Sequence, residues 1–140
     1  MTALSITAAN VSLVSGPEAG DQVAGEAFAA GALLYYNTTD SRWYKAKSSG
    51  NAAQAGQDGI GMALATADAA GARISIAKPG AVVAVGTGAA GTLYVVGATA
   101  GQVAPAADLS SGNKATFAGI GIGSNQLLLG YHYNAGAVVP

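Results

Sequence analysis

Hydrophobic and polar residues alternate with a period of two along most of the chain. In residues 72–77, Arg73 and Ser75 alternate with two isoleucines, and this pattern predicts a half-buried β-strand. The Lys78-Pro79-Gly80 segment that follows predicts a turn, because proline fixes its own φ and glycine tolerates a positive φ. A second apolar run comes directly after this turn, so we predict a hairpin over residues 72–85.

The same order of strand, turn and strand occurs three more times, in residues 33–47, 93–104 and 116–133. Residues 48–58 fall outside the pattern, because they contain no large apolar side chain, and predict a mobile surface loop. Short strands at intervals of about 8–12 residues, separated by glycine-rich turns, are typical of a sandwich or a barrel. We therefore predict an all-β fold, either a sandwich or a barrel.

The pattern also predicts an extended N-terminal arm (1–24), a β-rich domain (25–133) and a C-terminal tail (134–140). The arm alternates small polar and apolar side chains like a strand, and we expect it to find little to bury against within its own chain. Such an arm either adds a strand to the sheet edge of a partner or frays as a free terminus. The arm residues that we predict to bind the partner are Leu4, Ile6, Val11 and Leu13.

Two short motifs recur at a spacing of 60 residues. The run Ala29-Ala30-Gly31-Ala32-Leu33 matches residues 89–93, and Gly59-Ile60-Gly61 matches residues 119–121. Two blocks in the same register suggest two related halves of about 60 residues. Because residues 69–71 are also Ala-Ala-Gly before a predicted strand, the first motif can also be a turn that this chain uses repeatedly.

The composition excludes several classes of function. With 140 residues, 21 glycines and 9% charged residues, the chain fits one turn-rich domain, and its net charge of −1 favours self-association. The six basic residues are scattered, so we predict no nucleic-acid partner. The absence of cysteine excludes thiolate metal sites and cysteine nucleophiles. No window approaches 18 uninterrupted apolar residues, so we predict no membrane span.

The Gly59-Ile60-Gly61 motif opens the stretch GIGMALA, which resembles the start of a dinucleotide-binding loop. That fingerprint requires a preceding strand, a third glycine, a following helix and an acidic residue about 20 positions later. Here the motif follows the polar loop, Leu64 stands where the third glycine belongs, and Lys78-Pro79-Gly80 lies where the acidic residue is needed. We therefore interpret the glycines as positions where a strand bends or a neighbouring backbone approaches closely, and we predict no cofactor.

Other candidates for chemistry are isolated in the sequence. The single histidine, His132, shares a predicted strand face with Leu128 and Gly130, and we interpret it as a surface or interface residue. The seven carboxylates are dispersed, and no spacing suggests a metal site or a catalytic pair. We predict no catalytic, cofactor-binding or metal-binding residues.

Residues 42–45, Arg-Trp-Tyr-Lys, form the one aromatic cluster with polar neighbours. Trp43 and Tyr44 could stack on a sugar or a base as an aromatic surface. A cross-strand anchor for the hairpin over residues 33–47 is the more common role of such residues.

Several motifs, in their order and spacing, resemble those of one known protein family. The similarity covers residues 25–133 and leaves the arm outside. The motifs are Ala30-Gly31-Ala32-Leu33-Leu34-Tyr35, Trp43-Tyr44-Lys45-Ala46, Gly59-Ile60-Gly61-Met62-Ala63-Leu64-Ala65-Thr66-Ala67-Asp68, Ile74-Ser75-Ile76-Ala77-Lys78-Pro79-Gly80, Ala104-Pro105-Ala106-Ala107-Asp108-Leu109-Ser110-Ser111-Gly112, Gly119-Ile120-Gly121 and Leu127-Leu128-Leu129.

These motifs resemble the head decoration (capsid cement) proteins of tailed bacteriophages. The resemblance implies a β-tulip-like or small β-barrel fold and a homo-oligomer, most often a trimer. It also implies a structural protein without enzymatic activity that is made in the host cytoplasm, binds the major capsid protein on the outside of the virion and stabilises the shell. Two other functions compete with this expectation. One is a carbohydrate-binding β-module, and the other is a small hydrolase whose carboxylates are brought together by the fold.

Overall fold

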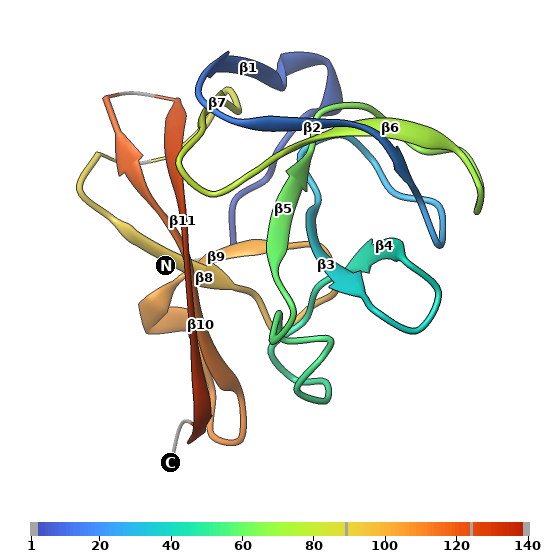
Figure 1. Cartoon of the computed structure of the whole chain (residues 1–140). Coiled ribbons are helices and arrows are strands. Elements are labelled where there is room, and N and C mark those ends of the chain that lie inside the picture. Colours follow the sequence, from blue (N-terminus) through green and yellow to red (C-terminus); the bar gives the residue numbers. More distant parts are fainter. Residues whose placement is uncertain (1–2, 89, 124, 139–140) are drawn as a thin grey trace.

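A computed structural model shows two antiparallel β-sheets and describes residues 3–88, 90–123 and 125–138, with side chains up to residue 133 (Figure 1). The predicted all-β class is confirmed. One sheet contains β2 (Glu18–Val23), β3 (Leu33–Asn37), β4 (Arg42–Lys45), β5 (Ile60–Ala63) and β6 (Arg73–Ala77). The other contains β1 (Ser12–Ser15), β7 (Val82–Ala84), β8 (Leu93–Val96), β9 (Val103–Pro105), β10 (Lys114–Ile122) and β11 (Gln126–Val138). Two 3₁₀ turns complete the structure, η1 (Ala8–Asn10) and η2 (Ala106–Asp108).

Both sheets are open, and the described residues form no closed barrel. The strand order is β2-β6-β5-β3-β4 in the five-stranded sheet and β1-β7-β11-β10-β8-β9 in the six-stranded sheet. Apart from β1, each sheet therefore places its strands in the same spatial order, namely first, fifth, fourth, second and third along the chain. The two sheets lie side by side in Figure 1, with β8–β11 on the left and β3–β5 on the right.

Three of the four predicted hairpins are present. β3 pairs with β4, β8 with β9, and β10 with β11. The hairpin predicted over residues 72–85 is wrong, although both of its strands exist, because β6 and β7 belong to different sheets. Its turn instead passes the chain from one sheet to the other.

Contacts at this turn explain why the chain changes sheets here. Gly80 donates its N–H to the carbonyl of Leu129 in β11 over 2.8 Å, and Lys78 donates its N–H to the carbonyl of Pro17 over 3.1 Å. Pro17 lies in the connection between β1 and β2, which also passes between the sheets. Two crossovers therefore bond to each other, and a period-two pattern contains no signal that separates such a crossover from a hairpin.

The main core lies between the two sheets. It combines side chains of β3 and β5 with side chains of β7, β8, β9, β10 and β11, and Leu33, Met62, Val83 and Val96 are fully buried within it. Burial of apolar area of this kind is the dominant favourable term in folding.

A second core lies on the opposite face of the five-stranded sheet. Leu34, Trp43 and Ile76 point to that face and are covered by the segments 24–32 and 64–72. Phe28 and Ala67 join these two segments by a pair of backbone hydrogen bonds of 3.0 and 2.8 Å. The five-stranded sheet is therefore covered on both faces.

The predicted domain boundaries differ from the observed elements. Residues 12–15 and 18–23 are strands of the two sheets, so most of the predicted arm belongs to the body of the fold. β11 continues to Val138, so residues 134–138 extend a strand instead of forming a separate tail.

The predicted loop over residues 48–58 is held to the body by hydrogen bonds. Ser48 and Ala55 are fully buried, and Lys114 donates from its Nζ to the carbonyl of Gly50 over 2.7 Å. The hydroxyl of Tyr131 donates to the carbonyls of Gly56 and Gln57 at 2.7 and 2.8 Å.

The two Gly-Ile-Gly motifs start no phosphate loop, and each contains a glycine in a strand where the neighbouring strand is close. A Cβ on Gly61 would lie 2.5 Å from the Ile76 side chain and 2.9 Å from the Ala77 carbonyl oxygen. A Cβ on Gly119 would lie 2.6 Å from the carbonyl oxygen of Leu128. Each glycine therefore permits a close approach of the neighbouring strand, β6 or β11, as its sequence context predicts.

Candidate interaction surfaces

The four predicted arm residues pack against the main core of their own chain. Leu4, Ile6, Val11 and Leu13 are half-buried, and the N–H of Leu4 donates to the carbonyl of Val103 over 2.9 Å. The expectation that this segment finds little to bury against within its own chain is therefore wrong.

Gly31 explains how the N-terminal segment is accommodated. Its φ is +91°, and a Cβ at this position would lie 2.5 Å from Cγ2 of Ile6 and 3.0 Å from Cγ2 of Val11. Only glycine meets both conditions, the positive φ and the missing side chain. The turn before β3 thus provides the surface on which the N-terminal segment lies.

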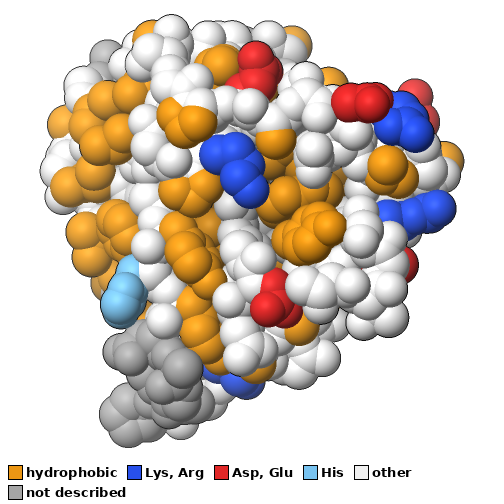
Figure 2. Space-filling model, viewed as in Figure 1, with side chains coloured by type: hydrophobic (Ala, Val, Ile, Leu, Met, Phe, Trp, Pro, Cys, Tyr) orange, Lys and Arg blue, Asp and Glu red, His pale blue; other side chains and the backbone are white. Residues whose placement is uncertain are grey.

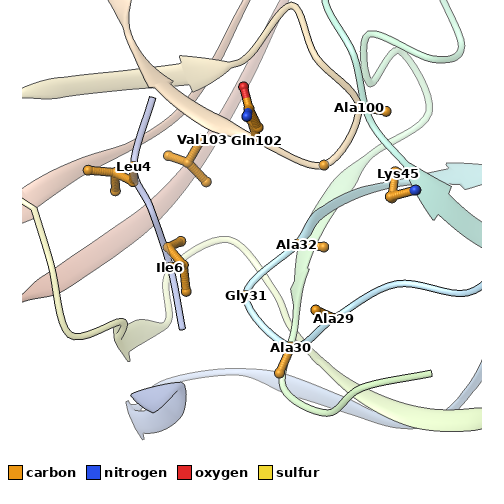
Figure 3. Close-up of a pocket in the computed structure, with 11 residues that line it drawn as sticks. Leu4, Ile6, Ala29, Ala30, Gly31, Ala32, Lys45, Ala100, Gln102 and Val103 are labelled. Atoms are coloured by element: carbon orange, nitrogen blue, oxygen red, sulfur yellow. The ribbon is translucent and has the colours of Figure 1, made fainter. Parts of the chain in front are cut away.

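A groove of about 230 Å³ follows the N-terminal segment. Figure 3 shows Leu4 and Ile6 on one side of it and the loop of Ala30 and Gly31 on the other. Lys45 is the single charged residue that lines this groove. Its walls are otherwise small or apolar side chains with Gln102, which offers no arrangement for acid–base chemistry.

Three of the four sheet edges are covered or charged. The N–H of Leu4 bonds to Val103 at the β9 edge, and the N–H of Gly25 bonds to the carbonyl of Trp43 at the β4 edge over 2.7 Å. At the β2 edge, Asp21 has a φ of +58° and pairs with Arg73 over 3.1 Å, and the strand register shifts there. Such bulges and charges prevent edge-to-edge association.

The fourth edge, β1, is different. No described strand pairs with its outer side, and its sequence Ser12-Leu13-Val14-Ser15 contains no charge and no proline. Val14, at an irregularity in the pairing with β7, is 51% exposed. The structure therefore leaves an uncharged strand edge available for pairing with another chain.

Trp43 is part of the second core and is not a surface platform. Its side chain is 2% exposed, its Nε1 donates to Oε1 of Gln22 over 2.9 Å, and its ring packs edge-on against Tyr36 with centroids 5.2 Å apart. Lys78 places its Nζ 4.9 Å from the ring centroid. A sugar ring cannot stack on an indole that is covered in this way.

Tyr44 is half-buried and pairs across the strands with Tyr35, with ring centroids 5.8 Å apart. Its hydroxyl donates a hydrogen bond of 2.5 Å to Oδ2 of Asp40. That hydrogen bond is the main reason that the pKa of Tyr44 is raised above its usual value. The contacts of this hairpin are those expected of a cross-strand anchor.

The titratable groups do not converge. Among the described residues, no three His, Asp or Glu side chains could together hold a metal ion. His132 is exposed, opposite Phe117 on the neighbouring strand. Burial raises the pKa of Tyr131, but its hydroxyl is used in binding the loop at Gly56 and Gln57.

The outer face of the six-stranded sheet is the largest feature that the sequence analysis missed. Leu93 and Leu128 are 50% and 37% exposed there, and the strands align them with Ile120 between them. A signal was present, because both faces of these strands are apolar in the sequence. That pattern is equally typical of a strand that its own chain covers on both faces. The sequence therefore does not distinguish such a strand from one with an exposed apolar face.

Searches of protein-family models, of curated proteins and of solved structures found no match for this chain. Within the described residues, the structure contains no helix that is long and apolar enough to cross a membrane.

Proposed function

We propose that this protein is a structural virion protein without enzymatic activity, which binds the outer surface of a tailed-phage capsid and stabilises the shell. The proposal starts from the resemblance of residues 25–133 to head decoration proteins. In this account the partners are the major capsid protein and further copies of the chain. The resemblance implies that these copies form a trimer. The all-β fold and the exposed apolar surfaces are compatible with that role.

The observation that supports capsid binding best is the free edge of β1. An extended segment of the shell would add to this edge by main-chain hydrogen bonds, with Val14 as an apolar side-chain contact. Leu4, Ile6, Val11 and Leu13 would then support β1 from the core side, whereas the arm hypothesis gave these residues direct contact with the partner. Many copies on one shell would make even a weak edge contact effective through multivalency.

We also infer that the two sheets derive from two related halves. The shared strand order supports this inference, and so do the motifs that recur at a spacing of 60 residues. The paired residues of one hairpin in each half agree as well. Tyr35 faces Tyr44 between β3 and β4, and Val95 faces Ala104 between β8 and β9, each 60 positions later.

Cosedimentation with empty, expanded heads of the phage that encodes the chain tests the proposed function. A Val14→Lys variant places a charge on the β1 edge, and we expect it to weaken binding to heads about tenfold or more. Ala70→Lys is the matched control, because Ala70 is exposed in the segment that covers the five-stranded sheet. If neither the wild-type chain nor the control binds heads, the capsid role is contradicted. If Val14→Lys binds heads as well as the wild type does, the role of the β1 edge is contradicted.

A further inference from the structure

Four apolar residues form a continuous row across the outer face of the six-stranded sheet. Leu93 in β8 pairs with Ile120 in β10, Ile120 pairs with Leu128 in β11, and Leu128 pairs with Val82 in β7. Side chains at directly paired positions lie on the same face, so the row crosses four strands without interruption. Leu93 and Leu128 are 50% and 37% exposed, and the other two are half-buried.

The surroundings of this row are apolar and almost uncharged. The Phe117 side chain also lies on this face, where it extends over Gly130; a Cβ on Gly130 would be 2.4 Å from the Phe117 ring. In β7, β8, β10 and β11 the one charged residue is Lys114, and its Nζ bonds to the Gly50 carbonyl of the loop. Figure 2 shows the orange side chains gathered around the pale-blue histidine on the side of the six-stranded sheet, while blue and red ones lie mostly elsewhere.

The residues 60 positions earlier in the chain lie in the five-stranded sheet, and there the equivalent face is buried against the six-stranded sheet. Leu33, Ile60 and Met62 belong to the main core, where the five-stranded sheet packs on the six-stranded one. Their counterparts at a spacing of 60 are Leu93, Ile120 and Ile122. These side chains point to the outer face of the six-stranded sheet, because Leu93 pairs with Ile120 and Ile122 lies two residues further along β10. These apolar side chains thus pack on a sheet in the first half of the chain, whereas their counterparts in the second half have no sheet to pack on.

The two sheets therefore form a stack that is closed at one end and open at the other. At the closed end, Phe28 and Ala67 and their segments cover the five-stranded sheet. At the open end, no segment among the described residues covers the row between Leu93 and Val82. In stacked β-structures an end of this kind needs a cap or a partner.

We propose that the outer face of the six-stranded sheet binds the same face of a second copy of this chain. Neither copy brings a charge to the contact, so the pairing involves no repulsion between like charges and leaves no buried charge unpaired. The closed end prevents a head-to-tail stack of sheets, which leaves the open face as the surface that both copies can use. The contact is therefore symmetric about a two-fold axis.

The dimensions of the face set the size of this contact. Three strand spacings of about 4.8 Å and about six residues along β10 give a footprint of about 300 Å². A stable dimer buries about 800 Å² on each partner, so the row forms the apolar centre of the interface and flanking residues must supply its rim. We expect a reversible dimer whose population depends on concentration.

This inference does not depend on capsid binding. A trimer with three equivalent contacts would require a second, complementary face on each copy, because its interfaces are not symmetric. The described surface offers one uncovered apolar sheet face. The resemblance therefore implies a trimer, whereas this face indicates a dimer, and native mass distinguishes the two.

Sedimentation equilibrium over a range of concentrations tests the proposal without any capsid. We expect the mass of the wild-type chain to rise to twice the chain mass. Leu93→Lys and Leu128→Lys should each weaken dimerisation about tenfold or more, because each would bury an unpaired charge at the centre of the interface. Ala70→Lys is the control on the closed end of the stack and should dimerise like the wild type.

Three outcomes would overturn the proposal. They are a wild-type chain that stays monomeric at every concentration, a wild-type trimer, and a dimer that both lysine variants form normally. Circular dichroism of each variant establishes that it is folded, and Leu128→Ser provides a milder change if a lysine variant unfolds. A monomeric chain that binds heads would contradict the dimer alone, whereas a dimer that does not bind heads would contradict the proposed function alone.

Discussion

The five-stranded and six-stranded sheets share one strand order but differ in how their faces are covered. The five-stranded sheet has a core on each face, one against the other sheet and one under the segments that contain Phe28 and Ala67. The six-stranded sheet has a core on one face and an exposed apolar row on the other. Equivalent strands can therefore serve either the folding of one chain or its association with another, depending on what the loops cover.

The largest expected effect compares the same substitution on the two sheets. Leu34 is fully buried in the second core, and Leu34→Ala should lower the free energy of unfolding by about 2–5 kcal/mol. Leu93 is half exposed, and Leu93→Ala should change the free energy of unfolding of the monomeric chain by less than about 0.5 kcal/mol. Urea denaturation at low protein concentration measures both values, and similar losses for the two variants would contradict the difference in coverage.

A smaller effect is expected at one glycine in each sheet where the neighbouring strand lies close. Gly61→Ala and Gly119→Ala should each cost about 1–3 kcal/mol, because the new Cβ would press on the neighbouring strand at 2.5–2.9 Å in the first case and 2.6 Å in the second. Gly20→Ala in β2 is the control, since the nearest atom to its Cβ would be 4.0 Å away. Thermal unfolding of the three variants measures these losses, and a neutral Gly119→Ala would contradict the close approach of β11 at this glycine.

Much of the fold could be predicted from the period of the sequence. The alternation of Ile74 and Ile76 with polar residues identified a strand, and Gly61 and Gly119 marked close approaches of backbones. The alternation of side chains reports which residues share a face, because that follows from local strand geometry. It does not report which strand becomes the neighbour, so the pattern around Lys78-Pro79-Gly80 predicts a hairpin where the chain passes to the other sheet.

The candidate surfaces were harder to predict, because they depend on tertiary coverage. Ile6 and Trp43 are residue types that are common in binding sites. The fold instead packs the half-buried Ile6 against Gly31 and buries Trp43 in the second core. Leu93 and Leu128 are of a residue type that is common in cores, yet no described segment covers them. An apolar side chain in a strand has the same pattern whether its cover comes from its own chain or from a partner.

The most direct test of the contrast between the two sheets is the exposure of their methyl groups to a soluble paramagnetic probe, measured by NMR at high and low protein concentration. We predict that the methyls of Leu34 and Ile76 are protected at both concentrations. The methyls of Leu93, Ile120 and Leu128 should be protected at high concentration and become exposed on dilution as the dimer dissociates. Exposure of these three side chains at every concentration would contradict the account.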